Sequence, residues 1–441
     1  MTAQTPEVVL AIDFSRDQLD VALRDADQQW LWGPRAYAND WPGWQKLKGH
    51  VLAELEARAP THLTVVGEST GPYWWHAFYQ FSHDSDLLPY APQLALLNPA
   101  HVKHYRRALS ERDKDDPDDA RLIDQYYRAV GVEHPYRFPE RYLPLRSFSR
   151  AYARVTHLLA SEKAYLLSVL YLWASAYRPG ADKPFSNLFG ATSQYVLTEY
   201  ANIQAIAALS LDELAALLQE RSGNAFAEPL TTADQLLKVA HSSYPLPEYL
   251  IEPLHQVLTL TLAHIRLLTD NQQAYRQLIV QALHSLPEAA QALAYRGLGP
   301  ILVAGCLSEI GDTTRFTTGT KFDRQRHQER PRTYRDGQAA VAKLAGLWWP
   351  RRDSGQVQGN RPHLARERNP YLRYWLVQSA HTLQRYQPEY RRYYWKKYRE
   401  ARSHPHKRAI VLTARKAVRL IFALLHKGRR TCLEEVRAPE S

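Results

Sequence analysis

Cysteine is scarce in this chain of 441 residues, which contains Cys306 and Cys432 and no others. The two lie far apart and match no zinc-binding spacing, which argues against a disulfide framework or a structural zinc site. Long apolar runs are also missing. The longest such stretch, residues 164–177, is interrupted by two serines and is shorter than the ~20 residues that span a bilayer. No basic segment precedes the first short apolar run, so no signal peptide is expected. We therefore expect a reduced, soluble, cytoplasmic protein without a membrane partner.

Acidic side chains are scarce near the C-terminus, where residues 385–430 contain 15 basic and 2 acidic side chains. Residues 1–100 have the opposite balance, with 12 acidic and 6 basic side chains. The formal net charge of the whole chain is +11, which favours a polyanionic partner, either nucleic acid or an anionic membrane surface. A solvated basic helix also accounts for the charge run taken by itself. The uneven distribution nevertheless indicates two separate roles.

Strand and helix signals alternate along the first 130 residues. Short apolar or alternating runs predict strands at 8–13, 19–23, 29–33, 62–68 and 87–90. Helical spacing predicts helices at 41–57, 73–81, 100–109 and 118–129. Three strands, a helix and then alternating strands and helices predict a mixed sheet with helices on its faces, in the order of an RNase H-like fold.

The rest of the chain is predicted to be mostly helical. Breaks are expected at 187–193, at Gly223 and at 245–247. From Leu254 to Ile279 a 4-3 spacing of mostly apolar residues predicts a helical seam. This spacing fits a coiled coil or antiparallel pair, and it fits a helix of an intramolecular bundle equally well. Further helices are expected at 301–310, 366–385 and 405–427, whereas the Arg-rich residues 312–350 are expected to form loops.

Four acidic residues lie where a metal site needs them. Asp13 and Glu68 each end a predicted buried strand, while Asp116 and Asp119 lie at a predicted helix with a spacing that places both on one face. Crowded carboxylates repel one another unless a cation lies between them, and Mg²⁺ prefers oxygen ligands. Each acid alone fits a solvated surface residue, but the four in this order predict a Mg²⁺ site suited to phosphodiester displacement.

The same residues carry a resemblance to a known family. The chain contains the motifs Ala11-Ile12-Asp13, Glu68-Ser69-Thr70-Gly71 and Lys114-x-Asp116-x-x-Asp119-Ala120. These resemble the motifs of the DEDD insertion-sequence transposases, which have a RuvC-like nuclease domain and include the bridge-RNA-guided recombinases. The resemblance implies that Asp13, Glu68, Asp116 and Asp119 are the catalytic, Mg²⁺-binding acids.

The C-terminal third contains segments similar to further landmarks of this family. In chain order they are Gly297-Leu298-Gly299-Pro300, Glu309-Ile310-Gly311-Asp312, Ala345-Gly346-Leu347, Ser354-Gly355 and Asn369 with Leu372 and Arg373. The resemblance implies that Ser354 is the catalytic nucleophile. A serine hydroxyl is a weak nucleophile that needs activation, and the attacked phosphate needs nearby cations. The expected phosphate-binding cations around the serine are Arg351, Arg352, Arg361, Arg366, Arg368 and Arg373.

Aromatic and basic residues interleave between residues 386 and 402. The basic residues singled out here are Arg391, Arg392, Lys396 and Lys397. Cations contact phosphates, and aromatic faces stack on unpaired bases, so the segment predicts nucleic-acid binding. An amphipathic helix whose aromatic residues belong to the core explains the same pattern, and the two interpretations are compatible.

The resemblance implies three regions. Residues 1–150 correspond to an RNase H-like (RuvC-like) nuclease domain, 151–290 to a helical linker and coiled-coil oligomerisation region, and 291–441 to a mostly helical transposase domain. The expected fold class is therefore α/β followed by α.

The function implied is DNA transposition by serine attack through a phosphoserine intermediate. The implied partners are donor and target double-stranded DNA, a structured non-coding RNA, and further copies of the chain in a dimer or tetramer. The residues themselves fit RNA and DNA equally. A Holliday-junction-type metal nuclease, a site-specific invertase without an RNA guide, and a non-catalytic nucleic-acid-binding protein remain as alternatives.

Overall fold

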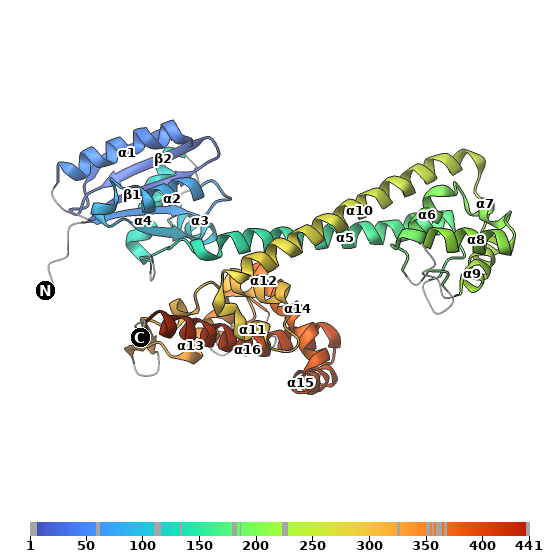
Figure 1. Cartoon of the computed structure of the whole chain (residues 1–441). Coiled ribbons are helices and arrows are strands. Elements are labelled where there is room, and N and C mark those ends of the chain that lie inside the picture. The colour runs from blue at the N-terminus through green and yellow to red at the C-terminus, as the bar shows by residue number, and fades with distance from the viewer. Residues whose placement is uncertain are drawn as a thin grey trace. The chain divides into compact units, whose positions relative to one another are not determined.

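The computed structural model describes most of the chain as two compact units, Met1–Phe138 and Pro139–Ser441 (Figure 1). The described residues are 7–58, 62–109, 116–132, 135–178, 183–185, 187–222, 228–323, 327–349, 353–354, 357–358, 364–365 and 368–437. Among these, the side chains of 116–118, 353–354, 357–358 and 432–437 are not described. Within the described part of the chain, no helix combines the length and the apolar character that crossing a membrane requires.

A five-stranded mixed sheet forms the centre of the first unit. Its strands are β1 Glu7–Phe14, β2 Gln18–Arg24, β3 Trp30–Ala38, β4 His62–Glu68 and β5 Gln93–Leu97, in the spatial order β3-β2-β1-β4-β5. The first three strands are antiparallel neighbours, while β1, β4 and β5 run parallel. The predicted mixed sheet is therefore confirmed, and the first four predicted strands are found.

The predicted strand at 87–90 is wrong. Leu88–Tyr90 forms a 3-10 turn instead, and the fifth strand is β5, which sequence analysis did not predict. Pro89 holds its own φ in the helical range and has no N–H to donate to a neighbouring strand. Ala91 then adopts a left-handed backbone conformation that ends the turn. The apolar run therefore enters the strand only after Pro92.

Helices cover both faces of this sheet, as expected. The helices are α1 Trp41–Glu56, α2 Trp75–His83, α3 Pro99–Ala108 and α4 Asp116–Val130. Side chains of α1 and α2 pack on one core that contains Leu10 and Ile12 of β1. Side chains of α3 and α4 pack on a second core that contains Val9 and Ala11. Because successive side chains of a strand point to opposite faces, Asp13 at the end of β1 lies on the α3/α4 face.

Two long helices, α5 Leu143–Trp173 and α10 Glu248–His284, pack against each other in the second unit. Gln272 donates to Thr156, and His264 lies 3.6 Å from Glu162, so the pair is antiparallel. The residues predicted as a seam face this partner within the chain, and Leu258 and Ile265 are fully buried there. The seam is thus used intramolecularly, and the expected role in oligomerisation stays a prediction.

A small helical bundle connects α5 to α10. It contains α6 Ala191–Glu199, α7 Ile203–Ala207, α8 Leu211–Ser222 and α9 Pro229–Ser242, which share an apolar core with the adjoining parts of α5 and α10. The predicted break at 245–247 is confirmed, because α10 begins after Pro247. The predicted break at 187–193 is confirmed as far as Gly190 and is wrong for residues 191–193, because α6 begins at Ala191. The predicted break at Gly223 lies outside the described residues.

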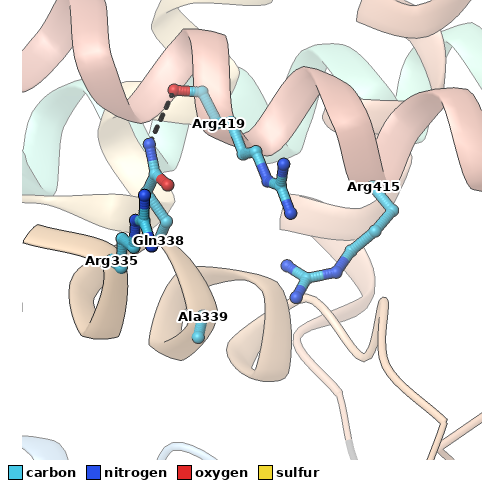
Figure 2. Close-up of a pocket in the computed structure, with 5 residues that line it drawn as sticks. All are labelled: Arg335, Gln338, Ala339, Arg415 and Arg419. Carbon is cyan, nitrogen blue, oxygen red and sulfur yellow. Dashed lines mark hydrogen bonds between the residues drawn. The ribbon is translucent and has the colours of Figure 1, made fainter.

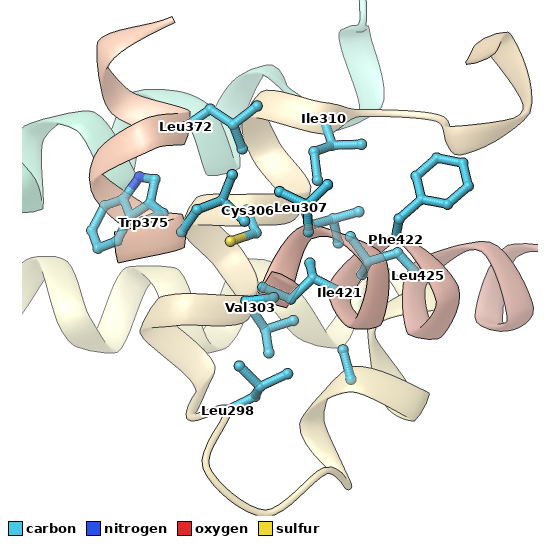
Figure 3. Packing of buried hydrophobic residues seen from close by; sticks show 14 of the residues in the cluster. Leu298, Val303, Cys306, Leu307, Ile310, Leu372, Trp375, Ile421, Phe422 and Leu425 are labelled. Carbon is cyan, nitrogen blue, oxygen red and sulfur yellow. The ribbon is translucent and has the colours of Figure 1, made fainter. Parts of the chain in front are cut away.

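The C-terminal part forms a larger apolar core around the buried helix α12 Pro300–Ile310 (Figure 3). The surrounding elements are η3 Pro287–Ala289, α11 Ala290–Leu293, η4 Thr313–Phe316, α13 Tyr334–Leu344, α14 Pro370–Tyr386, α15 Pro388–Arg399 and α16 Pro405–Arg437. Two short hairpins, β6 Thr320–Asp323 with β7 Gln328–Pro331 and β8 Asp353–Ser354 with β9 Val357–Gln358, lie between them in sequence. A Cβ at Gly305 would overlap the Trp375 ring, so α12 and α14 approach closely only because residue 305 is glycine.

The expectation that residues 312–350 form loops is wrong for the β6/β7 hairpin and for α13. Thr333 and Asp336 form a reciprocal capping box that starts this helix. Val341 and Ala342 bury its apolar side despite the many arginines around it. The predicted helix at 366–385 is found as α14, which starts at Pro370 because the Asn369 side chain accepts from the Leu372 N–H.

The first turns of α5 belong to the same C-terminal core. Leu145 and Ala153 are buried in it, and Arg150 donates to both carboxylate oxygens of Glu309, at 2.7 and 2.9 Å. Asn369 donates to the same carboxylate at 2.7 Å. Glu309 is 3% exposed, so this buried charge is satisfied only when α5, α12 and the start of α14 are all present.

Candidate active site and nucleic-acid interface

Acidic side chains end two neighbouring strands of the N-terminal sheet. Ile12 of β1 pairs with Gly67 of β4 in a parallel register, so Asp13 and Glu68 follow as neighbours. Glu68 in turn pairs with Leu97 of β5, whose side chain belongs to the core beneath α3 and α4. Because side chains alternate along a strand, both acids face the α3/α4 side of the sheet at the same edge.

Helix α4 contributes the third acid to this edge. Asp119 is 9% exposed and forms an ion pair with Arg106 of α3, while the adjoining Ala120 is completely buried. Asp116 is the first residue of α4, three positions before Asp119. Its side chain lies outside the described residues. The predicted placement of both acids on one helix is therefore confirmed for the backbone.

The pKa of Asp13 shows that these acids lie close to one another. Burial, followed by the nearby negative charges of Glu68 and Asp119, raises the pKa of Asp13 from 3.8 to about 6, while a backbone hydrogen bond at Phe14 opposes the rise. Like charges that raise a carboxyl pKa lie close enough to repel each other. The structure thus brings Asp13, Glu68 and Asp119 to one edge of the sheet, as sequence analysis predicted.

Two residues of this edge were not predicted. Asp20 of β2 lies directly opposite Asp13 in the antiparallel register and also raises its pKa. The signal was present, since Asp20, Ala22 and Arg24 alternate along one face of the strand. Arg106 carried no signal beyond its place in a predicted helix.

The carboxylate oxygens at this edge are suitable ligands for a hard cation, although they are not arranged as a preformed coordination site. Within the part of the chain that the structure describes, no group of three or more His, Cys, Asp or Glu side chains is close enough to hold a metal ion. Arg106 supplies positive charge to Asp119 instead. Mg²⁺ nonetheless prefers oxygen ligands such as carboxylates. The chemistry of these side chains is therefore compatible with a bound magnesium ion.

Helix α4 is held on the sheet by a buried ion pair. Arg24 of β2 donates through Nε to both carboxylate oxygens of Asp124, at 3.0 and 3.1 Å, and Arg128 adds a contact of 3.0 Å. Asp124 is 0% exposed. This pair sets the position of the helix that carries Asp119.

Replacing Asp124 with Ala is expected to lower the free energy of unfolding by about 3–5 kcal/mol, because it leaves the Arg24 charge buried without its partner. Urea denaturation of the full chain, followed by tryptophan fluorescence, measures the change. The exposed Asp27→Ala variant serves as the control and is expected to change stability by less than ~0.5 kcal/mol. A loss in Asp124→Ala no greater than in this control would mean that the pair does not hold the helix.

The serine region is described only in part. Ser354 lies in β8 and pairs with Val357 of β9, but its side chain is outside the described residues. Arg351, Arg352, Arg361 and Arg366 also lie outside them. The two described arginines are close to each other, since burial and then the charge of Arg368 lower the pKa of Arg373. The expected assembly of cations around Ser354 therefore stays a prediction.

Helix α15 divides its aromatic and basic residues between the core and the solvent. Tyr390 and Tyr394 are buried in the C-terminal core, whereas Trp395 is 47% exposed. Trp395 lines an open hollow together with basic residues of the same helix, namely Arg391, Arg392, Lys396 and Arg399. The amphipathic-helix interpretation is therefore confirmed, since one side of the helix packs on the core. The other side presents cations around an exposed indole ring, and nucleic-acid binding by it stays a prediction.

The four cations predicted on α15 differ in their partners. Arg391 donates to the carbonyl oxygens of Gln384 and Arg385, at the C-terminal end of α14, and Lys397 forms an ion pair of 2.6 Å with Glu400. Neither Arg392 nor Lys396 has an ion-pair partner among the described residues. These two are the most available for a phosphate.

Comparison with known proteins gives two matches to family models. Residues 10–173 match a model of DEDD transposases of the IS110 type, a segment that contains all four predicted acids. Residues 330–395 match a model described as transposases of the IS116/IS110/IS902 family, a segment that contains Ser354. No curated protein matches the chain.

Proposed function

The chain belongs to the IS110 family of DEDD transposases, and from that premise we propose that it exchanges DNA strands by covalent serine chemistry assisted by a Mg²⁺-binding acidic site. Transposase activity follows from the family. The serine mechanism, the metal and the RNA guide are our proposal. We also infer that the first unit has an RNase H-like fold, which the mixed order β3-β2-β1-β4-β5 and the helices on both faces support.

The observation that carries the proposal is the convergence of acids at one edge of the N-terminal sheet. The raised pKa of Asp13 is caused by burial and by Glu68 and Asp119, which supports a site that favours a cation. Asp13, Glu68, Asp119 and Asp116 would hold Mg²⁺ there. Magnesium, when bound, neutralises charge on the phosphate and polarises it toward attack. Among the chain's own groups, Arg106 lies beside Asp119 and lends positive charge to the same edge.

Ser354 supplies the attacking oxygen in this proposal. Its Oγ forms a bond to the scissile phosphorus while the bond to the 3′-oxygen breaks. The serine proton passes from Oγ to solvent water as that bond forms, and the departing 3′-oxygen takes up a proton from water to become a free hydroxyl. The product is a phosphoserine link to the 5′ end of the strand downstream of the cut. Attack by a different 3′-hydroxyl reverses the chemistry and completes strand exchange.

The acids and the serine lie in different units of the chain. We propose that a site is completed between protomers of a dimer or tetramer, as the family implies. Arg392, Lys396 and the exposed ring of Trp395 support contact with nucleic acid, because cations bind phosphates and an exposed indole stacks on unpaired bases. The proposed ligands are donor and target DNA and a structured non-coding RNA encoded next to the gene.

The experiment that tests the proposal uses the full chain expressed together with the DNA that flanks its gene. RNA that co-purifies with the protein is sequenced, and strand exchange between donor and target duplexes is measured with and without Mg²⁺ and RNA. We expect strand exchange to require both Mg²⁺ and the RNA. Strand exchange that persists after the RNA is removed would contradict the proposed RNA guide. Strand cleavage without rejoining would contradict the proposed recombinase activity.

A further inference from the structure

Three arginines converge on one pocket between helices α13 and α16 (Figure 2). Arg335, Gln338 and Ala339 line it from α13, and Arg415 and Arg419 line it from α16. Residues three and four positions apart share one face of a helix, so both helices present these side chains to a common space. Figure 2 shows the guanidinium groups of Arg415 and Arg419 pointing from α16 toward α13.

No carboxylate of the described residues lines this pocket. Among the described residues, none of its three arginines has an ion-pair partner. The nearest acid along α13, Asp336, is already engaged by Arg330 and Lys321. Burial and the neighbouring charge of Arg419 also lower the pKa of Arg415. Like charges held together without a counter-ion cost free energy, which an anion bound between them would offset.

The two helices are held firmly in place beneath these arginines. A Cβ at Gly337 would lie 2.7 Å from Cζ of Phe422, so glycine permits α13 to approach α16 closely. The Tyr334 and Phe422 rings pack with their centroids 5.3 Å apart. Gln338 Nε2 donates to the carbonyl oxygen of Arg419 at 3.4 Å. Packing of α13 on α16 therefore holds the three arginines close together, although their like charges repel one another.

We propose that this arginine pocket binds the phosphodiester backbone of a nucleic acid. A guanidinium offers a planar fork of donors that matches two phosphate oxygens, and the small side chain of Ala339 leaves space between the forks. The pocket lies on α13 and α16 and contains none of the basic residues of α15 that sequence analysis singled out, so it is a second group of cations. This inference rests on the proposed function and adds a backbone contact to it.

The test compares the full chain with an Arg335→Gln/Arg415→Gln/Arg419→Gln variant. Fluorescence anisotropy with a labelled duplex DNA and a labelled RNA hairpin measures affinity over a series of salt concentrations. We expect the triple variant to bind about 10- to 100-fold more weakly, with the slope of log K against log salt reduced by ~0.9 for each duplex phosphate that the variant fails to neutralise. Weaker binding of the duplex alone assigns the pocket to DNA, and weaker binding of the hairpin alone assigns it to RNA.

Two further variants separate charge from structure. The Arg→Lys triple variant keeps the charges and removes the forks, so it is expected to retain most of the salt slope with a smaller decrease in affinity. Arg276→Gln, which removes an exposed arginine from α10, is expected to change neither. The melting temperature of the Gln triple variant is expected to be unchanged or higher, because repulsion is removed. A lowered melting temperature that accompanies weaker binding would assign a structural role and overturn the proposal.

An Arg392→Gln/Lys396→Gln variant of α15 distinguishes failure of this inference from failure of the proposed function. If the α15 variant loses affinity while the pocket variant does not, the pocket proposal is wrong and nucleic-acid binding stands. If the wild-type chain binds neither the duplex nor the hairpin, both proposals are wrong.

Discussion

Asp13→Asn is expected to reduce DNA strand cleavage by roughly 10³-fold, which corresponds to about 4 kcal/mol of lost transition-state stabilisation. Asp13 ends the strand at the centre of the acidic edge, between Asp20 on one side and Glu68 on the other. An amide at this position keeps the shape of the side chain and removes the negative charge that a cation requires. Cleavage of a labelled duplex in Mg²⁺ measures the effect.

Folding and binding provide the controls for this variant. Because Glu68 and Asp119 repel the Asp13 carboxylate, Asp13→Asn is expected to melt at the same temperature as the wild type or higher when Mg²⁺ is absent. Its affinity for nucleic acid is expected to be unchanged. The exposed Asp17→Asn variant in the same unit should cleave normally. Normal DNA cleavage by Asp13→Asn would mean that the acidic edge of the sheet takes no part in the reaction.

Ser354→Ala is expected to eliminate the covalent protein–DNA adduct and to reduce strand exchange by at least ~10⁴-fold, as removal of a nucleophile does in other enzymes that use a covalent intermediate. The alanine variant keeps the backbone pairing of residue 354 with Val357 in the β8/β9 hairpin, since that pairing involves no side chain. A denaturing gel that separates labelled DNA from DNA linked to protein measures the adduct.

The exposed Ser403→Ala variant is the matched control for Ser354→Ala and is expected to form the adduct at the wild-type level. Strand cleavage that persists in Ser354→Ala without any adduct would favour hydrolysis by water, as in a junction-type nuclease. An adduct that persists in Ser354→Ala would place the nucleophile elsewhere in the chain.

The N-terminal sheet was predictable because its strands carry strong local signals. The buried core strands β1 and β4 read as short apolar runs that end in an acid, and the antiparallel strand β2 alternates. The strand β5 was missed because its five residues follow a proline-containing turn that reads as apolar itself. The helix α13 was missed because the Arg-rich sequence before it hides a narrow buried stripe, which only packing against Phe422 reveals.

The parts of the candidate site that follow from the positions of residues along the chain were predictable. Asp13 and Glu68 lie at the ends of two strands that each read as a short apolar run closed by an acid, and a spacing of three on α4 fixes the relation of Asp116 to Asp119. Arg106 joins the site through packing of α3 on α4, a contact that no spacing indicates. The pocket of Arg335, Arg415 and Arg419 depends likewise on two helices about 80 residues apart in sequence, whose approach is set by tertiary packing.

The ion pair between Arg150 and Glu309 has a consequence for synthesis of the protein. The two residues are 159 positions apart, so at ~5–20 residues per second a ribosome takes roughly 8–32 seconds to reach the second after making the first. During that interval the beginning of α5 has left the ribosome without the elements that cover it. A nascent chain must therefore keep this segment from premature association, and a prematurely terminated product would expose it permanently.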